Sequence, residues 1–334
     1  MNDVPALAVV GMNLGGPDSL DAVEPFLDNL FRDPDVIHLG WARPLQSLFA
    51  RVISHRRAPL SRRAYDQIGG RSPLLAETTA QVAAVVARLA STGVAAKPYV
   101  AMACWHPFSW EAIAAVESDG LRRAVALPFY PQYSETTTGS SVKALRRAAA
   151  ATARGTAGIE IAAVRSYPVA EGFVTALADT LTEAIATLPA ALRAEAPVLF
   201  SAHGLPESYI RKGDPYLDEV RSTVAAVSRR LALGARAQLS FQSRVGRRRW
   251  LGPDTEDALD RLGESGATAV VVCPVAFTGE HLETLQELDI VYRQRALGRG
   301  LKHFARARTV GTHPAFIDAL ADLTRDAAAA RGWI

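Results

Sequence analysis

Two segments of the chain combine residue types that could move protons or hold a cation. His203 follows the apolar run 197–202 and precedes a glycine. Because an imidazole has a pKa of about 6.5, it can take and give protons at neutral pH. The second segment, residues 280–289, contains four acids and His281. Carboxylates and imidazoles together suit a divalent first-row metal ion, so the chemistry indicated is proton transfer, metal handling or both.

Each segment also has a structural interpretation, and the residues alone leave both open. A histidine at the end of a strand is either a catalytic base or a hydrogen-bonded structural side chain. Glu280, Glu283 and Glu287 share one face of the helix expected here, and a run of charges is most often a solvated surface. Like charges at this spacing repel, so solvent, arginines or a bound cation must compensate them.

Short apolar runs alternate with longer stretches that have the apolar spacing of helices. We predict strands at residues 7–13, 99–104, 123–129, 159–164, 197–202, 237–242 and 269–275. Helices are expected between them, at residues 77–89, 111–116, 141–151, 169–188, 216–231 and 255–262. This alternation indicates βαβ units, and hence an α/β fold of two Rossmann-like, doubly wound parallel sheets. Ligands of such sheets bind beyond the carboxyl ends of the strands, where both segments fall.

Two further strand ends carry candidate residues. Residues 13–18 form a Gly/Pro turn without the G-x-G-x-x-G pattern, and no Walker A motif occurs in the chain. A nucleotide site is therefore not indicated. Phe129 and Tyr130 come at the end of the third predicted strand and could line a pocket for a flat, apolar ligand.

Composition excludes several classes of function. With a formal net charge of +3 in 334 residues, the chain lacks the basic excess of a nucleic-acid-binding protein. Its two cysteines, Cys104 and Cys273, cannot form a four-cysteine cluster within one chain, and their apolar surroundings make them poor nucleophiles. No G-x-S-x-G or H-E-x-x-H sequence occurs, so neither a serine hydrolase nor a permanently bound catalytic zinc is expected.

The sequence contains no segment that predicts a membrane span. Its first residues lack a positive n-region, and the longest uncharged apolar stretch, residues 267–277, is far shorter than the roughly 20 residues that cross a bilayer. We therefore expect a cytoplasmic protein with at most peripheral membrane contact. Residues 37–59, rich in arginine and leucine, are expected to form a membrane-facing lip or a pocket wall.

Seven runs, in order along most of the chain, together resemble the ferrochelatases, which insert ferrous iron into a porphyrin in haem synthesis. The runs are residues 13–17, 68–74, 105–107, 128–141, 201–206, 241–246 with 250–253, and 280–289. The resemblance is to bacterial protoporphyrin enzymes without an iron–sulfur cluster. It implies two Rossmann-like domains with a porphyrin cleft between them: residues 1–165 with the C-terminal helix 312–334, and residues 166–311.

The resemblance also implies roles for individual residues. His203 and Glu283 are implied as catalytic, the first as proton acceptor and the second as an aid to proton transfer or metal delivery. The metal is expected at His203, Glu283 and Glu287, and a polar trail for protons and cations at Glu280, His281 and Asp289. Porphyrin contacts are expected from Leu14, Arg57, Tyr65, Ser72, Phe129, Tyr130 and Trp250.

The implied substrates are protoporphyrin IX and Fe²⁺, and the implied products are protohaem and two protons. Iron enters as a substrate, and no cofactor is expected to stay bound. The sequence leaves a monomer and a homodimer equally open.

The chain departs from the family pattern in two places. Ala103-Cys104 stand where the family usually has Arg-Tyr, and Val291 stands where an acid is common. Two alternatives follow. One is a weakened or inactive porphyrin-binding relative, and the other is a chelatase for another tetrapyrrole or metal, such as coproporphyrin III or cobalt. Intact His203 and Glu283 favour an active enzyme.

Overall fold

A computed structural model describes residues 7–33, 45–152, 158–244 and 248–334. The chain divides into two compact units: the first is Met1–Tyr130, Ser134–Ser166 and Ile317–Ile334, and the second is Pro131–Tyr133 and Tyr167–Phe316. Residues 37–44 and 245–246, which the sequence singled out, lie outside the described residues. Within the described ranges, no helix has the length and apolar character needed to cross a membrane.

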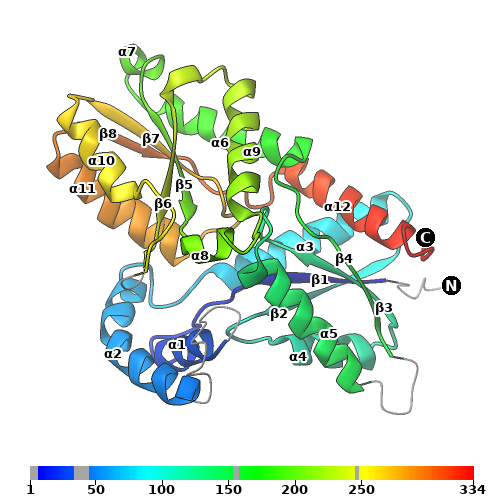
Figure 1. Ribbon diagram of the computed structural model, residues 1–334. Coiled ribbons are helices and arrows are strands. Elements are labelled where there is room, and N and C mark those ends of the chain that lie inside the picture. The colour runs from blue at the N-terminus through cyan, green and yellow to red at the C-terminus, as the bar shows by residue number, and fades with distance from the viewer. Residues whose placement is uncertain (1–6, 34–44, 153–157, 245–247) are drawn as a thin grey trace. The chain divides into compact units, whose positions relative to one another are not determined.

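The first unit is built on a parallel sheet with strand order β2-β1-β3-β4 (Figure 1). Its strands are β1 (Leu7–Asn13), β2 (Ala96–Met102), β3 (Arg123–Pro128) and β4 (Glu160–Ala163). All of β1 is buried, as its unbroken apolar run predicts for a strand covered on both faces. Val10 and Met12 pack with α4 (Ser109–Ser118) and α5 (Ser140–Thr152). Gly11 faces α3 (Leu74–Ser91) on the other side.

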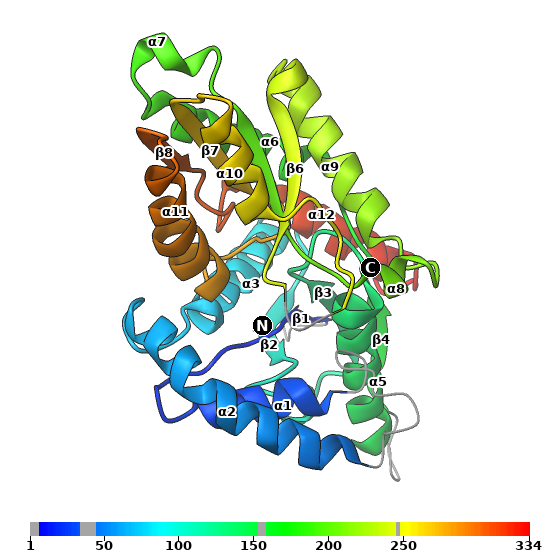
Figure 2. The same cartoon turned by 60° about the vertical axis from the view of Figure 1, so that its left-hand side comes forward.

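The second unit repeats this architecture, with strand order β6-β5-β7-β8. Its strands are β5 (Val198–His203), β6 (Ala237–Gln242), β7 (Ala269–Pro274) and β8 (His303–Arg306). Helices α6 (Glu171–Ala186) and α9 (Tyr216–Arg230) cover one face, and α10 (Thr255–Glu264) and α11 (Arg293–Gly298) cover the other (Figure 2). On the latter face Leu199, Val270 and Val272 pack against Leu259 and Leu288.

The remaining helices lie around these two sheets. They are α1 (Val23–Arg32), α2 (Gln46–Asp66), the single-turn helices α7 (Ala190–Arg193) and α8 (Glu207–Ile210), and α12 (Pro314–Ala329). A short 3₁₀ turn spans Gly234–Arg236. Two π-helical segments, with i→i+5 hydrogen bonds, are Glu135–Gly139, which leads into α5, and Glu283–Tyr292, which leads into α11.

The shared strand order fixes where a ligand would bind in each unit. The chain winds from the first strand to one side and then returns to the other, so the switch point lies between the first and third strands. In the second unit these strands are β5, which ends at His203, and β7, which leads to the segment 280–289. The fold therefore brings the two chemically suggestive segments to one edge of one sheet.

All seven predicted strands are present, with ends shifted by at most three residues. The eighth, β8, was not predicted, because only Phe304 and Ala305 of its four residues are apolar and no hydrophobic run marks it. Its side chain Arg306 proves important below the level of the fold.

Candidate active site

His203 is the last residue of β5, and its backbone is fixed on two sides. It pairs in register with Gln242 of β6, and its carbonyl accepts a hydrogen bond from the Tyr216 hydroxyl at 2.8 Å. Burial lowers the pKa of His203, opposed by the nearby charge of Glu283, while His281 lowers it further. At pH 7 the imidazole is therefore mostly neutral and able to accept a proton.

Phe277 separates the two imidazoles of the site. Its ring meets His203 edge-on, with centroids 6.4 Å apart, and lies 4.5 Å from the ring of His281. The sequence analysis did not single out this phenylalanine, although it directly follows the strand β7 and its adjoining turn. An apolar ring here shields the space around His203 from water, which strengthens the electrostatic interactions there.

His281 and Glu283 share a single proton. The His281 Nδ1–H donates to the carbonyl of Gly279 at 3.0 Å, while Nε2 lies 3.3 Å from a carboxylate oxygen of Glu283. With Nδ1 already donating, a hydrogen bond between Nε2 and Glu283 needs a proton on one of the two groups. The pair can therefore store or pass on one proton beside His203.

Glu287 is the most strongly perturbed acid of the site. Its Oε2 accepts hydrogen bonds from Ser243 Oγ at 2.5 Å and from Gln242 Nε2 at 2.8 Å. Burial raises the pKa of Glu287 to about 7, and the charge of Glu283 contributes to the rise. A carboxyl group with this pKa exchanges protons readily at neutral pH.

A buried hydrogen-bonded chain orients Gln242. Ser201 Oγ donates to Gln242 Oε1 at 2.7 Å, which leaves the Gln242 amide nitrogen free to donate to Glu287 and to the Glu283 carbonyl. Thr255 continues the chain at 2.9 Å from Ser201. Gln242 and Ser243 belong to a run that the sequence had marked only by family resemblance. Their contact with Glu287 gives that run a physical reason.

Glu280 and Asp289 are not free to serve as ligands. Arg306 donates to both oxygens of Asp289, at 2.6 and 2.7 Å, and to Glu280 Oε1 at 3.0 Å. The expectation that Glu280 shares a helix face with Glu283 and Glu287 is wrong, because the helix begins after Glu280 and Arg306 turns Glu280 toward β8. Arginine, rather than solvent or a cation, compensates these two charges.

Trp250 lies directly beside the histidine loop. Leu251 N–H donates to the Leu205 carbonyl at 2.8 Å, so the segment around Trp250 runs alongside residues 204–206. A β-carbon on Gly204 would lie 2.9 Å from the Gln242 carbonyl and 3.3 Å from the Trp250 ring. The glycine is therefore needed for this close packing, which sets the indole next to His203.

In the first unit, three of the expected porphyrin contacts gather around the turn after β1. The Leu14 carbonyl accepts from Cys104 N–H at 2.9 Å, and the Pro17 carbonyl accepts from Ser72 N–H at 2.8 Å. A β-carbon on Gly16 would meet Ser72 Oγ at 2.5 Å and the Tyr65 hydroxyl at 3.7 Å. Leu14, Ser72 and Tyr65 therefore lie around one turn, at the carboxyl end of a central strand.

Arg57 lies on α2, eight residues before Tyr65. Its guanidinium sits over the ring of Phe31, 5.9 Å from the centroid. Among the ion pairs formed by described residues, none involves Arg57. A carboxylate of a ligand could therefore pair with it.

The aromatic pair after β3 is packed more deeply than the sequence suggested. Phe129 is only 2% exposed and its ring packs against Gly11 of β1, which gives it a core position rather than a place on a pocket wall. The Tyr130 hydroxyl points inward, close to Cys104 and Ser141, and burial raises its pKa. Burial also raises the pKa of Cys104, and that of Cys273 to about 12, so neither thiol is a nucleophile.

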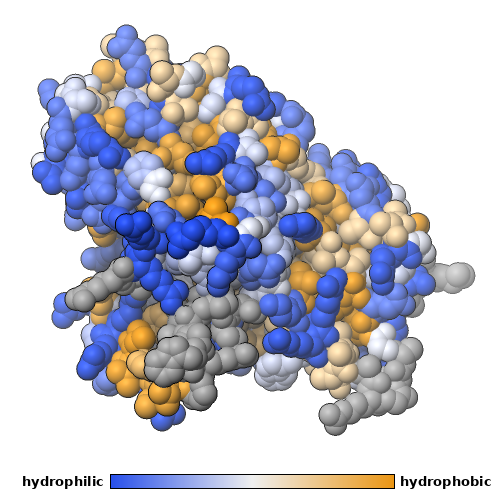
Figure 3. Space-filling view, in the orientation of Figure 1, coloured by the Kyte–Doolittle hydropathy of each residue, from blue (hydrophilic) through white to orange (hydrophobic). Residues whose placement is uncertain are grey.

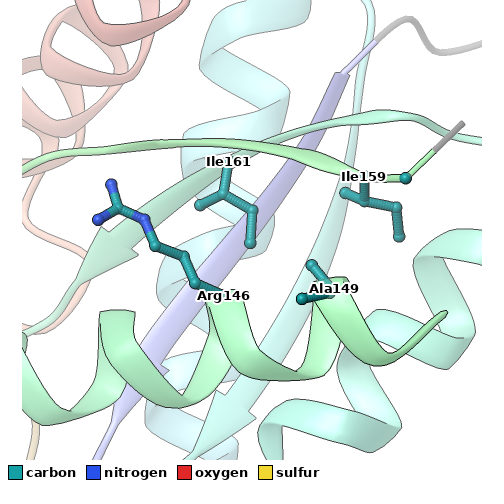
Figure 4. A pocket seen from close by; sticks show the side chains of 6 residues that line it. Arg146, Ala149, Ile159 and Ile161 are labelled. Atoms are coloured by element: carbon teal, nitrogen blue, oxygen red, sulfur yellow. The ribbon is translucent and has the colours of Figure 1, made fainter. Parts of the chain in front are cut away.

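The described residues contain no group of three or more His, Cys, Asp or Glu side chains placed to hold a metal ion. His203, Glu283 and Glu287 are brought to one region, but not as a preformed coordination shell. A hollow of about 220 Å³ between α5 and β4, lined by Arg146, Ala149, Ile159 and Ile161, contains no histidine or acid and lies away from these residues (Figure 4).

Comparison with known proteins gives a consistent result. The family model described as Ferrochelatase matches residues 6–328. A ferrochelatase of Geotalea uraniireducens is 41% identical over 95% of this chain and 96% of its own, and one of Synechococcus sp. (strain JA-3-3Ab) is 44% identical over 95% and 92%.

Solved structures show a similar fold at low identity. A cobalt complex of the sirohydrochlorin chelatase SirB from Bacillus subtilis subspecies spizizenii covers 97% of this chain and 95% of its own, with a TM-score of 0.51 and 12% identity. SirB from Bacillus subtilis with Fe³⁺ covers 76% and 91%, with a TM-score of 0.55 and 13% identity. At these identities the likeness concerns the fold alone.

Proposed function

The chain belongs to the ferrochelatase family, so its reaction is the insertion of ferrous iron into a porphyrin, and we propose that His203 and Glu283 carry out this insertion on protoporphyrin IX. Two pyrrole N–H bonds break, four iron–nitrogen bonds form, and two protons leave. The observation that carries the assignment is the placement of His203, Glu283 and Glu287 at one switch-point edge, where burial perturbs the pKa of His203 and of Glu287.

His203 is the first proton acceptor. Its imidazole is neutral at pH 7 because burial lowers its pKa, and a neutral imidazole can take a proton from a pyrrole nitrogen. The charge of Glu283 then stabilises the imidazolium that forms, since an opposite charge close by favours the protonated state. His203 is thus paired with a group that makes proton uptake easier.

Glu283 and Glu287 take the proton onward. Glu283 already shares a proton with His281, so a proton arriving from His203 displaces one from this pair. Glu287, with its pKa of about 7 and its hydrogen bonds from Ser243 and Gln242, is suited to accept it and release it. Carboxylate and imidazole groups along the same route are also suitable transient ligands for Fe²⁺, the substrate.

The porphyrin is held by apolar and hydroxyl groups from both units. Trp250 beside His203, and Leu14, Tyr65 and Ser72 around the turn after β1, provide surfaces for a flat macrocycle. Tyr130 stays a predicted contact, whereas Phe129 is left out because of its core position. Arg57 is assigned to a propionate. The cleft expected between the two units stays a prediction.

No iron–sulfur cluster is part of this proposal. Such a cluster needs four thiolates, and the chain has two cysteines, both buried and in different units. We propose that the protein works in the cytoplasm, as a monomer or a homodimer, without a resident cofactor.

Helix α2 is the proposed peripheral membrane contact. Leu45, Leu48, Phe49, Val52 and Ile53, here called the apolar stripe, are all exposed, and Leu48 is 63% exposed. They recur at helical spacing, and Figure 3 shows hydrophobic side chains over α2 at the lower left. Exposed Arg51 and Arg56 lie on the same helix, so an anionic lipid surface suits both the apolar and the basic side chains.

The test is anaerobic metalation. Purified protein should convert protoporphyrin IX to its Fe²⁺ or Zn²⁺ complex, followed by the change in porphyrin absorbance. A relative that binds porphyrin without inserting metal would give a spectral shift on binding and no turnover. That second outcome would reject the proposed function and support the alternative raised by Ala103-Cys104.

A further inference from the structure

We propose that Arg306 is a positioning residue of the metalation site, which acts by fixing both ends of the segment that carries Glu283 and Glu287. The inference rests on the proposed function and extends it to a strand that the sequence gave no reason to consider. Its basis is the set of contacts made by one guanidinium at the edge of the second sheet.

Arg306 holds Asp289 in a two-bond geometry. Nε donates to Oδ1 at 2.6 Å and Nη2 donates to Oδ2 at 2.7 Å, which is the parallel arrangement that only arginine can make with a carboxylate. Asp289 lies inside the π-helix Glu283–Tyr292, so this contact joins the middle of that helix to β8.

The same guanidinium holds Glu280, which precedes the helix. Nη1 donates to Glu280 Oε1 at 3.0 Å, and Thr309 donates to the same oxygen through its N–H at 3.0 Å. Oε2 accepts from the Thr284 hydroxyl at 2.5 Å. Both oxygens of Glu280 are thereby occupied, and the turn into the helix is tied to β8 and to the segment just after it.

Electrostatics make this arrangement hard to replace. The Arg306 side chain is only 11% exposed. Burial works against its charge, but Asp289 and Glu280 hold the pKa of Arg306 above its usual value. Burial likewise disfavours the charge of Glu280, yet Arg306 and Thr284 hold its pKa below the usual value. Removal of the arginine would leave two carboxylates without their common partner.

The two active-site acids lie between these two anchors. Glu283 begins the π-helix three residues after Glu280, and Glu287 precedes Asp289 by two residues. A π-helical stretch of this length is rare and needs support from its surroundings. Without Arg306 the segment could relax toward ordinary α-helical bonding, which would turn Glu287 away from Ser243 and change its direction relative to Glu283.

The experiment compares Arg306→Lys and Arg306→Gln with Arg308→Gln. Arg308 is a matched control, because it follows the same strand and pairs with Glu183, but both side chains are more than half exposed. Steady-state metalation with Zn²⁺ is measured well below the melting temperature, and kcat and the KM of each substrate are determined separately. We expect kcat/KM for the metal to fall about 10- to 100-fold in both Arg306 variants, as for other partners of metal-handling groups. The KM for porphyrin should change less than about twofold, as should every parameter of Arg308→Gln.

A purely structural role predicts a different pattern. Arg306→Lys would then lower the melting temperature while kcat and both KM values of the folded enzyme stay at wild-type levels, and this result would overturn the inference. Inactive wild-type protein would instead contradict the proposed function itself, so the two failures are distinguishable.

A triple variant covers the case in which the single variants do not fold. Arg306→Gln with Glu280→Gln and Asp289→Asn removes all three charges and keeps similar shapes, so no carboxylate is left unpaired. If Arg306 acts as a clamp, this variant should fold but keep the defect in kcat/KM for the metal. Wild-type kinetics in the triple variant would show that the arginine only neutralises charge, and would refute the positioning role.

Discussion

Burial favours the neutral form of both His203 and Glu287, and this shared preference gives the site its proton chemistry. A neutral imidazole can accept a proton, and a carboxyl group with a pKa of about 7 can accept and release one at neutral pH. The hydrogen bonds from Ser243 and Gln242 work in the opposite direction and keep the Glu287 pKa from rising further. Position and burial, rather than residue type, distinguish Glu287 from the chain's exposed acids.

The first prediction concerns pH. Below about pH 7 Glu287 is mostly protonated and cannot accept a proton, and above it the carboxylate is available, so kcat should rise with pH through about 7. Glu287→Gln should lower kcat and remove this inflection. The lower inflection, from protonation of His203 below its usual pKa, should remain. Persistence of the inflection near pH 7 in Glu287→Gln would contradict the assignment, and Glu207→Gln, at an exposed acid, serves as control.

The second prediction concerns Gly204. An added β-carbon would lie 2.9 Å from the Gln242 carbonyl and 3.3 Å from the Trp250 ring, so Gly204→Ala should displace the indole and destabilise the fold by about 1–3 kcal/mol. The KM for porphyrin should rise. Gly298→Ala is the control, since a β-carbon there meets nothing within 4 Å. Equal melting temperatures and equal porphyrin KM values for the two variants would show that the close packing is unimportant.

At the scale of elements, the sequence predicted what periodicity and burial encode. The buried central strands were found because parallel strands covered on both faces leave long apolar runs, as in β1 and β7. Strand β8 was missed, since four residues with polar ends carry no such signal. The π-helix was also missed: Glu283 and Glu287 fit ordinary helical spacing, and the clamp that holds the wider turns comes from Arg306, outside the segment. The orientation of Gln242 likewise depends on Ser201 and Thr255, which are distant in sequence.

The third prediction belongs to helix α2. If its apolar stripe touches lipid, Leu48→Ser combined with Val52→Ser should weaken binding to vesicles of phosphatidylcholine and phosphatidylglycerol about 10-fold or more, because two sizeable apolar side chains lose their burial. Co-sedimentation measures the effect. Leu297→Ser, at an exposed leucine of α11, should leave binding unchanged. Unaltered vesicle binding by the double variant would exclude the stripe as the contact.

For the whole molecule, the repeated strand order puts candidate residues at equivalent places in the two units. Leu14 follows β1 as the loop after His203 follows β5, and Tyr130 follows β3 as the segment 280–289 follows β7. The chemistry is not repeated: the second unit holds the titratable groups, and the first holds apolar and hydroxyl groups around Ser72 and Tyr65. Porphyrin binding and proton transfer should therefore be separable by substitution.

The fourth prediction tests this division of labour. Arg57→Gln should raise the KM for protoporphyrin about 10-fold and leave kcat within about twofold, because a charge-assisted hydrogen bond to a propionate is lost. Glu283→Gln should lower kcat and leave porphyrin KM nearly unchanged. Arg56→Gln, at the exposed neighbouring arginine, is the control. A fall in kcat without a change in KM for Arg57→Gln would contradict the assignment of Arg57 to binding.

The central claim is that His203 accepts the porphyrin protons, and a comparison of binding with insertion in one variant tests it most directly. Wild-type protein and His203→Ala are titrated with protoporphyrin IX by fluorescence, and Fe²⁺ insertion is then followed anaerobically. The account predicts similar porphyrin affinity for both proteins and a loss of insertion rate of at least about 100-fold in His203→Ala. Insertion by His203→Ala at a rate close to that of the wild type would contradict the claim.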